Sequence, residues 1–305
     1  MRLIRAEEMM TIDRQAIQQL GIPGAVLMEN AGRACVDIFC REFVDLFPGP
    51  VLVMAGKGNN GGDGYVMARL LAELGWQVQT LILGDAGDIV GDAAVMLNIL
   101  QQLGLPFAYV ADEAALPHEF TVAGPKIIID ALLGTGLKSN VRGLFASAID
   151  LVNRSETKVF SVDIPSGVDG SSGRICGLAV QSDVTVTFDH AKIGHGTQPG
   201  AACAGLLEVA DIGIPQAMRP EIESDVVLVD ASDAASWLPD RSEVGHKGRF
   251  GHLLLLSGSP GKTGAAALAG NAAVRGGCGL VTAAVPAAVH DILEIKLTEA
   301  MTCPL

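Results

Sequence analysis

The sequence predicts an α/β fold, a doubly wound (Rossmann-like) parallel sheet with helices on both faces, followed by an incomplete α/β unit at the C-terminus. Mainly apolar segments recur along the chain, at 51–55, 78–83, 126–133, 158–164, 184–188 and 206–209. Helical patterns separate these segments, and glycine-rich loops follow several of them. Continuous apolar strands that alternate with helices are typical of a parallel sheet covered on both faces, which binds ligands at the carboxyl ends of its strands.

Two helices are expected before the first strand. Met9, Ile12 and Ala16 recur at helical spacing within 6–20, which predicts an amphipathic helix. The sequence Gly-Ile-Pro-Gly ends this helix, and a second helix is expected over 25–43. A third helix is expected over 65–74, after the glycine-rich loop that follows the first strand.

The chain of 305 residues is long enough for two domains. A polar, acidic stretch at 216–244 predicts a linker, with a short strand at 226–229 inside it. We therefore expect a first domain over 1–215 and a partial second domain over 245–305, which is short for a domain.

Composition and charge exclude several classes of protein. The formal net charge is −13 and no cluster of Lys or Arg occurs, which argues against a nucleic-acid partner. Residues 1–13 lack the apolar stretch of a signal peptide, and Asn271 and Arg275 interrupt the most apolar window, so no membrane span is expected. Six cysteines without a CxxC pair predict free thiols, and hence a cytoplasmic protein.

The first motif, GKGNNGGDG at 56–64, contains a GxGxxG string between a predicted strand and helix. That string alone indicates a dinucleotide site only weakly, and Trp76 stands where such a site needs an acidic residue. One interpretation is a tight turn in which Asp63 caps the helix. The amides of Asn59 and Asn60, beside free backbone N–H groups, instead favour a phosphate or a hard cation.

Two further motifs follow later strands. Asp130 precedes Gly134-Thr135-Gly136, and Asp163 precedes Pro165-Ser166-Gly167. Asp130 alone could be an ordinary turn former. Because the carboxyl ends of parallel strands meet at one edge of the sheet, the three motifs together predict a shared ligand site.

Zinc and P-loop sites are not expected. His195, His246 and His252 lack the spacing of zinc ligands. Gly261-Lys262-Thr263 is similar to the end of a P-loop, but Leu256 occupies the position of the required first glycine.

The three motifs, read as GKGNNGGDGYVMARLL, DALLGTGL and VDIPSGVDG, closely resemble the NAD(P)H-hydrate epimerase domain. The similarity covers roughly residues 1–215 and includes Lys192. Asp189-His190 depart from the family, which more often has a glycine and a small residue there. The resemblance implies epimerisation of the R and S forms of C6-hydrated NADH and NADPH, a small-molecule substrate, and a homodimer.

The resemblance also implies site residues. Substrate contacts are implied at Asn59, Asn60, Gly61, Gly62, Asp63, Gly134, Thr135, Gly136, Leu137, Lys138, Ser139, Asn140 and Asp163. One potassium ion is implied between Asn60, Asp130 and Ser166. The substrate is a hemiaminal, which inverts by ring opening and reclosure or by loss and re-addition of water. Both routes need general acid–base catalysis, for which Asp163 and Asp63 are the candidate catalytic residues.

The segment from 245 to 286 resembles the start of the ADP- or ATP-dependent NAD(P)H-hydrate dehydratase, which has a ribokinase-like fold. The resemblance implies a substrate contact at Ala265. The nucleotide-binding loop of that family lies further downstream than this chain extends. The chain therefore resembles a bifunctional repair enzyme cut short, and dehydratase activity is expected only in a full-length chain supplied with ADP or ATP.

Two other functions stay open at the level of the sequence. An NAD(P)-dependent oxidoreductase would use the GxGxxG loop to bind its cofactor. A non-catalytic scaffold would keep the fold without the activity. The joint presence of Asn60, Asp130, Asp163 and Ser166 argues against a scaffold.

Overall fold

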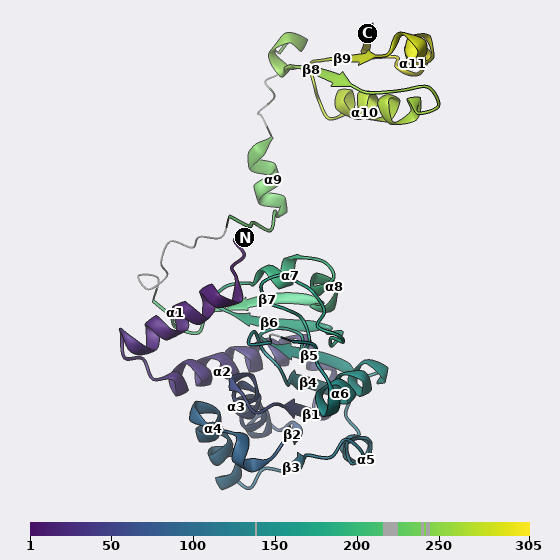
Figure 1. Ribbon diagram of the computed structural model, residues 1–305. Helices are drawn as coiled ribbons and strands as arrows, with labels where there is room; N and C mark the ends of the chain where they lie inside the picture. Colours follow the sequence, from purple (N-terminus) through teal and green to yellow (C-terminus); the bar gives the residue numbers. More distant parts are fainter. Residues whose placement is uncertain (138, 216–224, 239–240, 242–244) are drawn as a thin grey trace. The chain divides into compact units, whose positions relative to one another are not determined.

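The computed structural model describes residues 1–137, 139–215, 225–238, 241 and 245–305 (Figure 1). Lys138, an implied substrate contact, lies outside the described residues. The chain forms two compact units, Met1–Asp230 and Ala231–Leu305, and their boundary falls within the segment that its composition marks as a linker. Within the described ranges, no helix is long and apolar enough to cross a membrane.

The first unit is built on a seven-stranded parallel sheet, which confirms the predicted fold class (Figure 1). In chain order its strands are β1 (Pro50–Ala55), β2 (Gln77–Leu83), β3 (Phe107–Val110), β4 (Ile127–Ala131), β5 (Lys158–Val162), β6 (Val184–Phe188) and β7 (Leu206–Ala210). The sequence did not predict β3, a short edge strand whose residues are mostly half-buried or exposed. Such a strand carries no continuous apolar pattern.

The order of the strands places a ligand crevice at the centre of the sheet. The order is β3-β2-β1-β4-β5-β6-β7, so the chain winds in one direction after β1 and in the other after β4. Ligands of open α/β sheets bind at such a switch point, outside the carboxyl ends of the two strands. The loops that begin at Gly56 and Leu132 meet there.

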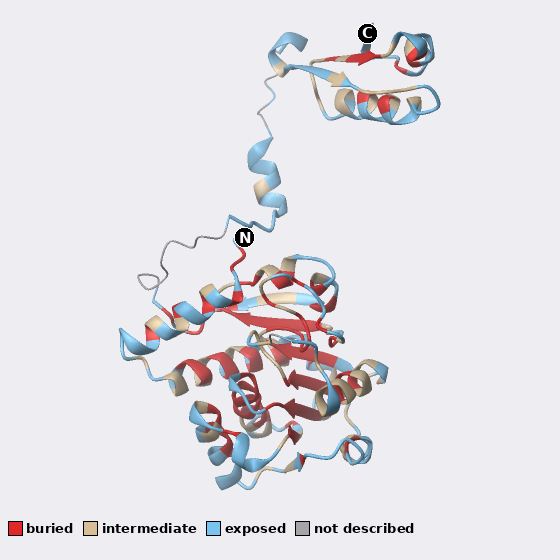
Figure 2. Ribbon diagram, in the orientation of Figure 1, coloured by how far each residue is buried: buried red, intermediate tan, exposed pale blue. Residues whose placement is uncertain are grey.

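Helices cover both faces of this sheet, as predicted. Helices α1 (Ala6–Gln18), α2 (Gly24–Glu42), α3 (Asn59–Glu73) and α4 (Gly91–Gln102) lie on one face, and α5 (Leu116–Ala123) and α6 (Gly143–Arg154) on the other (Figure 1). Two short helices, α7 (Ile193–Gly196) and α8 (Gly200–Cys203), precede β7. Alternate strand residues feed the two cores: Val53 packs with the first layer and Met54 with the second. Figure 2 shows the buried sheet between half-exposed helices.

Helix α3 begins six residues earlier than the sequence predicted, at Asn59 instead of Tyr65. A Cβ atom at Gly61 would lie 2.0 Å from the carbonyl oxygen of Gly56, and one at Gly64 would lie 2.7 Å from the Cβ of Ala131. The glycines therefore allow the first turns of α3 to lie directly against the strand ends, and they do not form a loop.

The second unit contains a three-stranded parallel sheet with the order β10-β9-β8. Its elements are α9 (Ala231–Trp237), β8 (His252–Leu256), α10 (Thr263–Arg275), β9 (Leu280–Val285), α11 (His290–Lys296) and β10 (Met301–Pro304). Helices α10 and α11 pack on the sheet around Ala266, Val281 and Leu293. Within the first unit, the predicted strand at 226–229 is wrong: Val227 forms only an isolated bridge with Arg2.

Candidate functional site

The three motifs meet at the switch point beside β1, at Asn60, Gly134 and Ser166. The Cβ position of Gly134 lies 3.4 Å from the Cβ of Asn60, which joins the first motif to the second. The backbone N–H of Leu133 donates to the Ser166 hydroxyl over 2.8 Å, and that hydroxyl lies 3.1 Å from the Leu133 carbonyl oxygen. The structure therefore brings together all three motifs around one point.

Asp130 lies inside β4 and is fully buried, not in the turn after the strand. Its Oδ1 accepts from the Ser166 hydroxyl at 2.5 Å and from the Leu132 N–H at 3.3 Å. Its Oδ2 accepts from the Ser161 hydroxyl at 2.8 Å and from the Ser166 N–H at 2.9 Å. Burial raises the pKa of the Asp130 carboxyl, although these donors act in the opposite direction. The carboxylate thus ties β4 to β5 and to the loop that follows it.

Asn60 carries a buried side-chain amide whose Oδ1 and Nδ2 both lack a hydrogen-bond partner among the described residues. An unsatisfied buried polar group costs about 1–3 kcal/mol, and such groups are rare in folded proteins. The fold keeps this amide at the switch point in spite of that cost. A ligand that donates to, or coordinates, the amide would remove the cost.

Asp163 directly follows β5 and adopts a left-handed backbone conformation, with φ of 64°. Its Oδ1 accepts from the Lys192 ammonium at 2.7 Å and from the Thr187 hydroxyl at 3.0 Å. Burial alone would raise the pKa of Asp163, but the Lys192 ammonium, with help from His195 and Thr187, holds it below its ordinary value. Asp163 is therefore an ionised carboxylate at neutral pH.

Lys192 and His195 hold this carboxylate in place. The Lys192 ammonium, 1% exposed, also donates to the Thr187 hydroxyl and to the Phe188 carbonyl oxygen. His195 Nδ1 accepts from the Lys192 N–H at 3.0 Å, so its Nε2–H donates to the Asp163 carbonyl oxygen at 3.0 Å. Burial and the nearby ammonium lower the pKa of His195 to about 4, which keeps the ring neutral.

Asp63 is buried within the second turn of α3 and does not cap the helix, because the N-cap residue is Gly58. It lines a cavity of about 120 Å³ together with Asn59 from α3 and Asp13 from α1. Burial, followed by the charges of Asp163 and Asp13, raises the pKa of Asp63 well above its ordinary value. The surroundings of Asp63 thus favour its protonated form, whereas those of Asp163 favour the ionised form.

A second cavity, of about 210 Å³, lies on the other side of α1. Thr135, Gly136 and Leu137 form one wall, and Arg14 of α1 lines it as well. Helix α1 thus has one cavity on each side of it, and each cavity contains residues that the resemblance assigns to the substrate.

Five other residues that the resemblance assigns to the substrate line neither of these two cavities. Gly61 and Gly62 are buried in the packing of α3; a Cβ at Gly62 would lie 2.5 Å from the Met28 sulfur. Ser139 and Asn140 are exposed and line neither cavity. Ala265 is an exposed residue in the first turn of α10, in the second unit.

The sequence reasoning did not assign roles to Asp13, Thr187 or Lys192. The sequence offered a signal for Lys192, because a lone lysine lies shortly after a predicted strand. In the structure this lysine is 1% exposed. Asp13 offered none, because it lies on an amphipathic helix where an aspartate is usually a solvated residue.

Asp189 departs from the family pattern and adopts φ of 59°, a conformation that glycine adopts readily and Asp tolerates. Its fully buried carboxylate lies 2.6 Å from His190 Nδ1. Asp189 therefore adopts a backbone conformation that a glycine at this position would also adopt.

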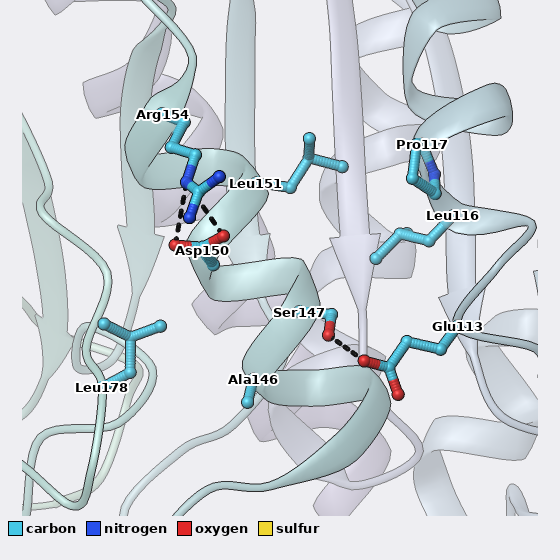
Figure 3. Close-up of a pocket in the computed structure, with 9 residues that line it drawn as sticks. All are labelled: Glu113, Leu116, Pro117, Ala146, Ser147, Asp150, Leu151, Arg154 and Leu178. Atoms are coloured by element: carbon cyan, nitrogen blue, oxygen red, sulfur yellow. Dashed lines mark hydrogen bonds and ion pairs between the residues drawn. The ribbon is translucent and has the colours of Figure 1, made fainter.

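A third cavity, of about 590 Å³, lies between the start of α5 and helix α6 (Figure 3). Arg154 pairs with Asp150 on one side of it, and Ser147 donates a hydrogen bond to Glu113 on the other (Figure 3). None of the implied site residues lines this cavity, so it lies apart from the switch point.

Comparisons with known proteins identify relatives of the chain. The family model described as YjeF-related protein N-terminus matches residues 24–194. The bifunctional NAD(P)H-hydrate repair enzyme Nnr of Moorella thermoacetica is 42% identical over 307 residues, which cover 100% of this chain and 58% of that protein. The Salinibacter ruber enzyme of the same name is 34% identical, and the match also covers 58% of its length. The chain thus spans little more than half the length of these relatives.

Two further similar proteins match about two thirds of the chain. The NAD(P)H-hydrate epimerase of Rhodopirellula baltica is 35% identical over 205 residues, which cover 67% of this chain and 81% of that protein. The crystal structure of the yeast protein YNL200c superimposes with a TM-score of 0.57 at 25% identity, and covers 64% of this chain and 83% of the yeast chain.

Proposed function

The chain belongs to the family of YjeF-related protein N-terminal domains, and we propose that its first unit is an NAD(P)H-hydrate epimerase. It would interconvert the R and S forms of C6-hydrated NADH and NADPH without redox change. The names of the relatives favour this activity over an NAD(P)-dependent oxidoreductase. The match to the epimerase of Rhodopirellula baltica covers most of that protein, so the proposal concerns the first unit only.

One observation carries the proposal: Asp63 and Asp163 interact within one buried region, and their surroundings raise the pKa of Asp63 but lower that of Asp163. Inversion at a hemiaminal carbon needs a proton donor and a proton acceptor in the same site, by either route. Two carboxyl groups whose environments push their pKa values apart are a common solution to this need. Asp63 would donate the proton, and the fixed charge of Asp163 would help to keep Asp63 protonated.

Lys192 and His195 would act as positioning residues for Asp163. Lys192 supplies the positive charge that keeps this carboxylate ionised. Neutral His195 binds the Asp163 main chain and stabilises its left-handed conformation. Neither residue lines the cavity that contains Asp63.

The residues at the switch point fit a monovalent cation, and we include potassium in the proposal, held by Asn60, Asp130 and Ser166. A cation that binds Asn60 Oδ1 would satisfy an oxygen that otherwise has no partner among the described residues. The single carboxylate of Asp130, with neutral amide, hydroxyl and carbonyl oxygens, provides too little charge for a typical all-protein divalent site. When bound, the ion would supply a positive charge beside the substrate loop at Gly134.

Other parts of the proposal rest on the family alone. The second unit would contribute to ADP- or ATP-dependent dehydration only within a full-length repair enzyme, with Ala265 at the substrate. We also propose a cytoplasmic homodimer. The resemblance supports both statements.

The test of the proposed function is direct. One purified epimer of NADH hydrate is incubated with the chain, and both epimers are separated by chromatography over time. We expect interconversion faster than the spontaneous rate, with no change in the absorbance of reduced nicotinamide, and no dehydration when ADP or ATP is added. An unchanged epimer would refute the assignment, and the appearance of NADH with ADP would refute the statement on the second unit.

A further inference from the structure

Asp13 is a charged residue that helix α1 directs into the cavity it shares with Asp63. Its neighbour Ile12 is fully buried, so this part of α1 is anchored on the first unit. Asp13 lines the cavity of about 120 Å³ together with Asn59 and Asp63. The next residue, Arg14, lines the other cavity, on the other side of the helix.

The carboxylate of Asp13 makes no hydrogen bond or ion pair within the part of the chain that the structure describes. The same holds for Asp63, which is 7% exposed and lines the same cavity. A buried polar side chain without a protein partner is expected to bind a ligand or to take part in chemistry. Three carboxyl groups therefore line one small volume: buried Asp63, half-buried Asp13 and half-buried Asp92, which lies at the start of α4.

Asp163 is a weaker candidate for the base. Its Oδ1 is held by Lys192 and Thr187, and it does not line the cavity. Its pKa is lowered by Lys192, which reduces its affinity for a proton. The residue that accepts a proton from a substrate in the cavity must instead be one that faces the cavity.

We propose that Asp13 is the catalytic base and Asp63 the catalytic acid of the epimerisation, an inference that rests on the proposed function. In ring opening, the hydroxyl proton passes to Asp13 as the C6–O double bond forms. The C6–N bond breaks, and its electron pair takes the proton of Asp63. After rotation about the C5–C6 bond, the nitrogen attacks the other face of the carbonyl carbon, and each carboxyl group regains its original state.

The electrostatic surroundings of Asp13 suit a base that works near neutral pH. Burial raises its pKa to about 6, Lys192 acts against this, and Asp163 and Asp189 act with it. The charged and titratable groups that face it come from four segments: Asp63 of α3, Asp92 of α4, Asp163 after β5, and Asp189, His190 and Lys192 after β6. A carboxylate of this kind binds a proton more strongly than Asp163 but is ionised at pH 7.

The experiment compares wild type, Asp13→Asn, Asp13→Glu and Asp163→Asn, with the exposed Asp37→Asn as a matched control. Initial rates of epimer interconversion are measured from pH 5 to 8. Wild type loses activity as the pH falls through about 6, where Asp13 takes up a proton. We expect Asp13→Asn to lower the rate about 10²–10⁴-fold and to abolish this acid limb. Asp13→Glu should keep a limb and part of the rate.

Asp163→Asn should lower the rate but keep the acid limb, since the base is still present. An Asp13→Asn variant with the wild-type rate, or with an unchanged acid limb, would overturn the assignment. Folding is checked by the fluorescence of Trp76, and Asp13→Glu serves where Asp13→Asn does not fold. If wild type itself does not interconvert the epimers, the proposed function fails, and that outcome is distinct from an active wild type with an equally active Asp13→Asn.

Discussion

Replacement of Lys192 by Met tests the central electrostatic feature of the site. Met has a similar length and no charge, so the change leaves the Asp163 carboxylate buried without its ammonium partner. Removal of one partner of a buried ion pair typically costs about 3–5 kcal/mol. The three hydrogen bonds of the ammonium, to Asp163, Thr187 and Phe188, are lost as well. We expect the free energy of unfolding of the first unit to fall by an amount in this range at pH 8.

The loss should depend on pH in a defined direction. In wild type the pKa of Asp163 is lowered, so the pair stabilises the fold above the unfolded value of 3.8 and loses this contribution as the pH falls through the folded value. In Lys192→Met, burial is no longer opposed and the pKa of Asp163 rises. The deficit should therefore be largest at pH 7–8 and shrink toward pH 4, where the carboxyl group is protonated.

The assay uses the positions of the two tryptophans. Trp76 is buried in the first unit, and Trp237 is 67% exposed in the second. In a Trp237→Phe background, fluorescence during urea unfolding reports on the first unit alone. Asp163→Asn combined with Lys192→Met should recover most of the loss, because neither charge is then left unpaired. A Lys192→Met variant as stable as wild type at pH 8, or a double variant no more stable than Lys192→Met, would refute the reasoning.

Three further predictions concern the same site. Asp163→Asn should lower the rate of epimerisation, because the charge of Asp163 supports protonation of Asp63, and should lower the unfolding midpoint, because the Lys192 ammonium loses its counter-charge. Full activity in the epimer assay would remove Asp163 from the site. Gly61→Ala should destabilise the first unit by about 1–3 kcal/mol in urea, because its Cβ would lie 2.0 Å from the Gly56 carbonyl oxygen; an unchanged midpoint would contradict this packing. Asn60→Ala should abolish any stimulation of activity by potassium over tetramethylammonium. It should leave the unfolding midpoint in potassium-free buffer nearly unchanged, since the amide has no partner within the described residues. A large loss of stability would indicate a structural role.

The sequence alone determined the fold class and the place of the site in the chain. Mainly apolar strands such as 51–55 and 184–188 are buried along their whole length, and such strands can be recognised from the sequence. Because the apolar strands could be recognised, Asp130 and Asp163 could be placed near the carboxyl ends of two of them. The errors were local: the start of α3 was missed because Gly61 and Gly64 read as loop residues, whereas close packing against Gly56 and Ala131 requires them inside a helix.

Tertiary structure alone decided which side chains share a cavity and which charge each one carries. Asp13 of α1 and Asp63 of α3 line one cavity, and no local sequence pattern relates these two helices. The raised pKa of Asp63 and the lowered pKa of Asp163 depend on burial and on the distance to Lys192, and the folded sheet sets both. Periodicity reports which face of an element is buried, but the electrostatic interaction between two groups depends on their separation in space, which the sequence does not contain.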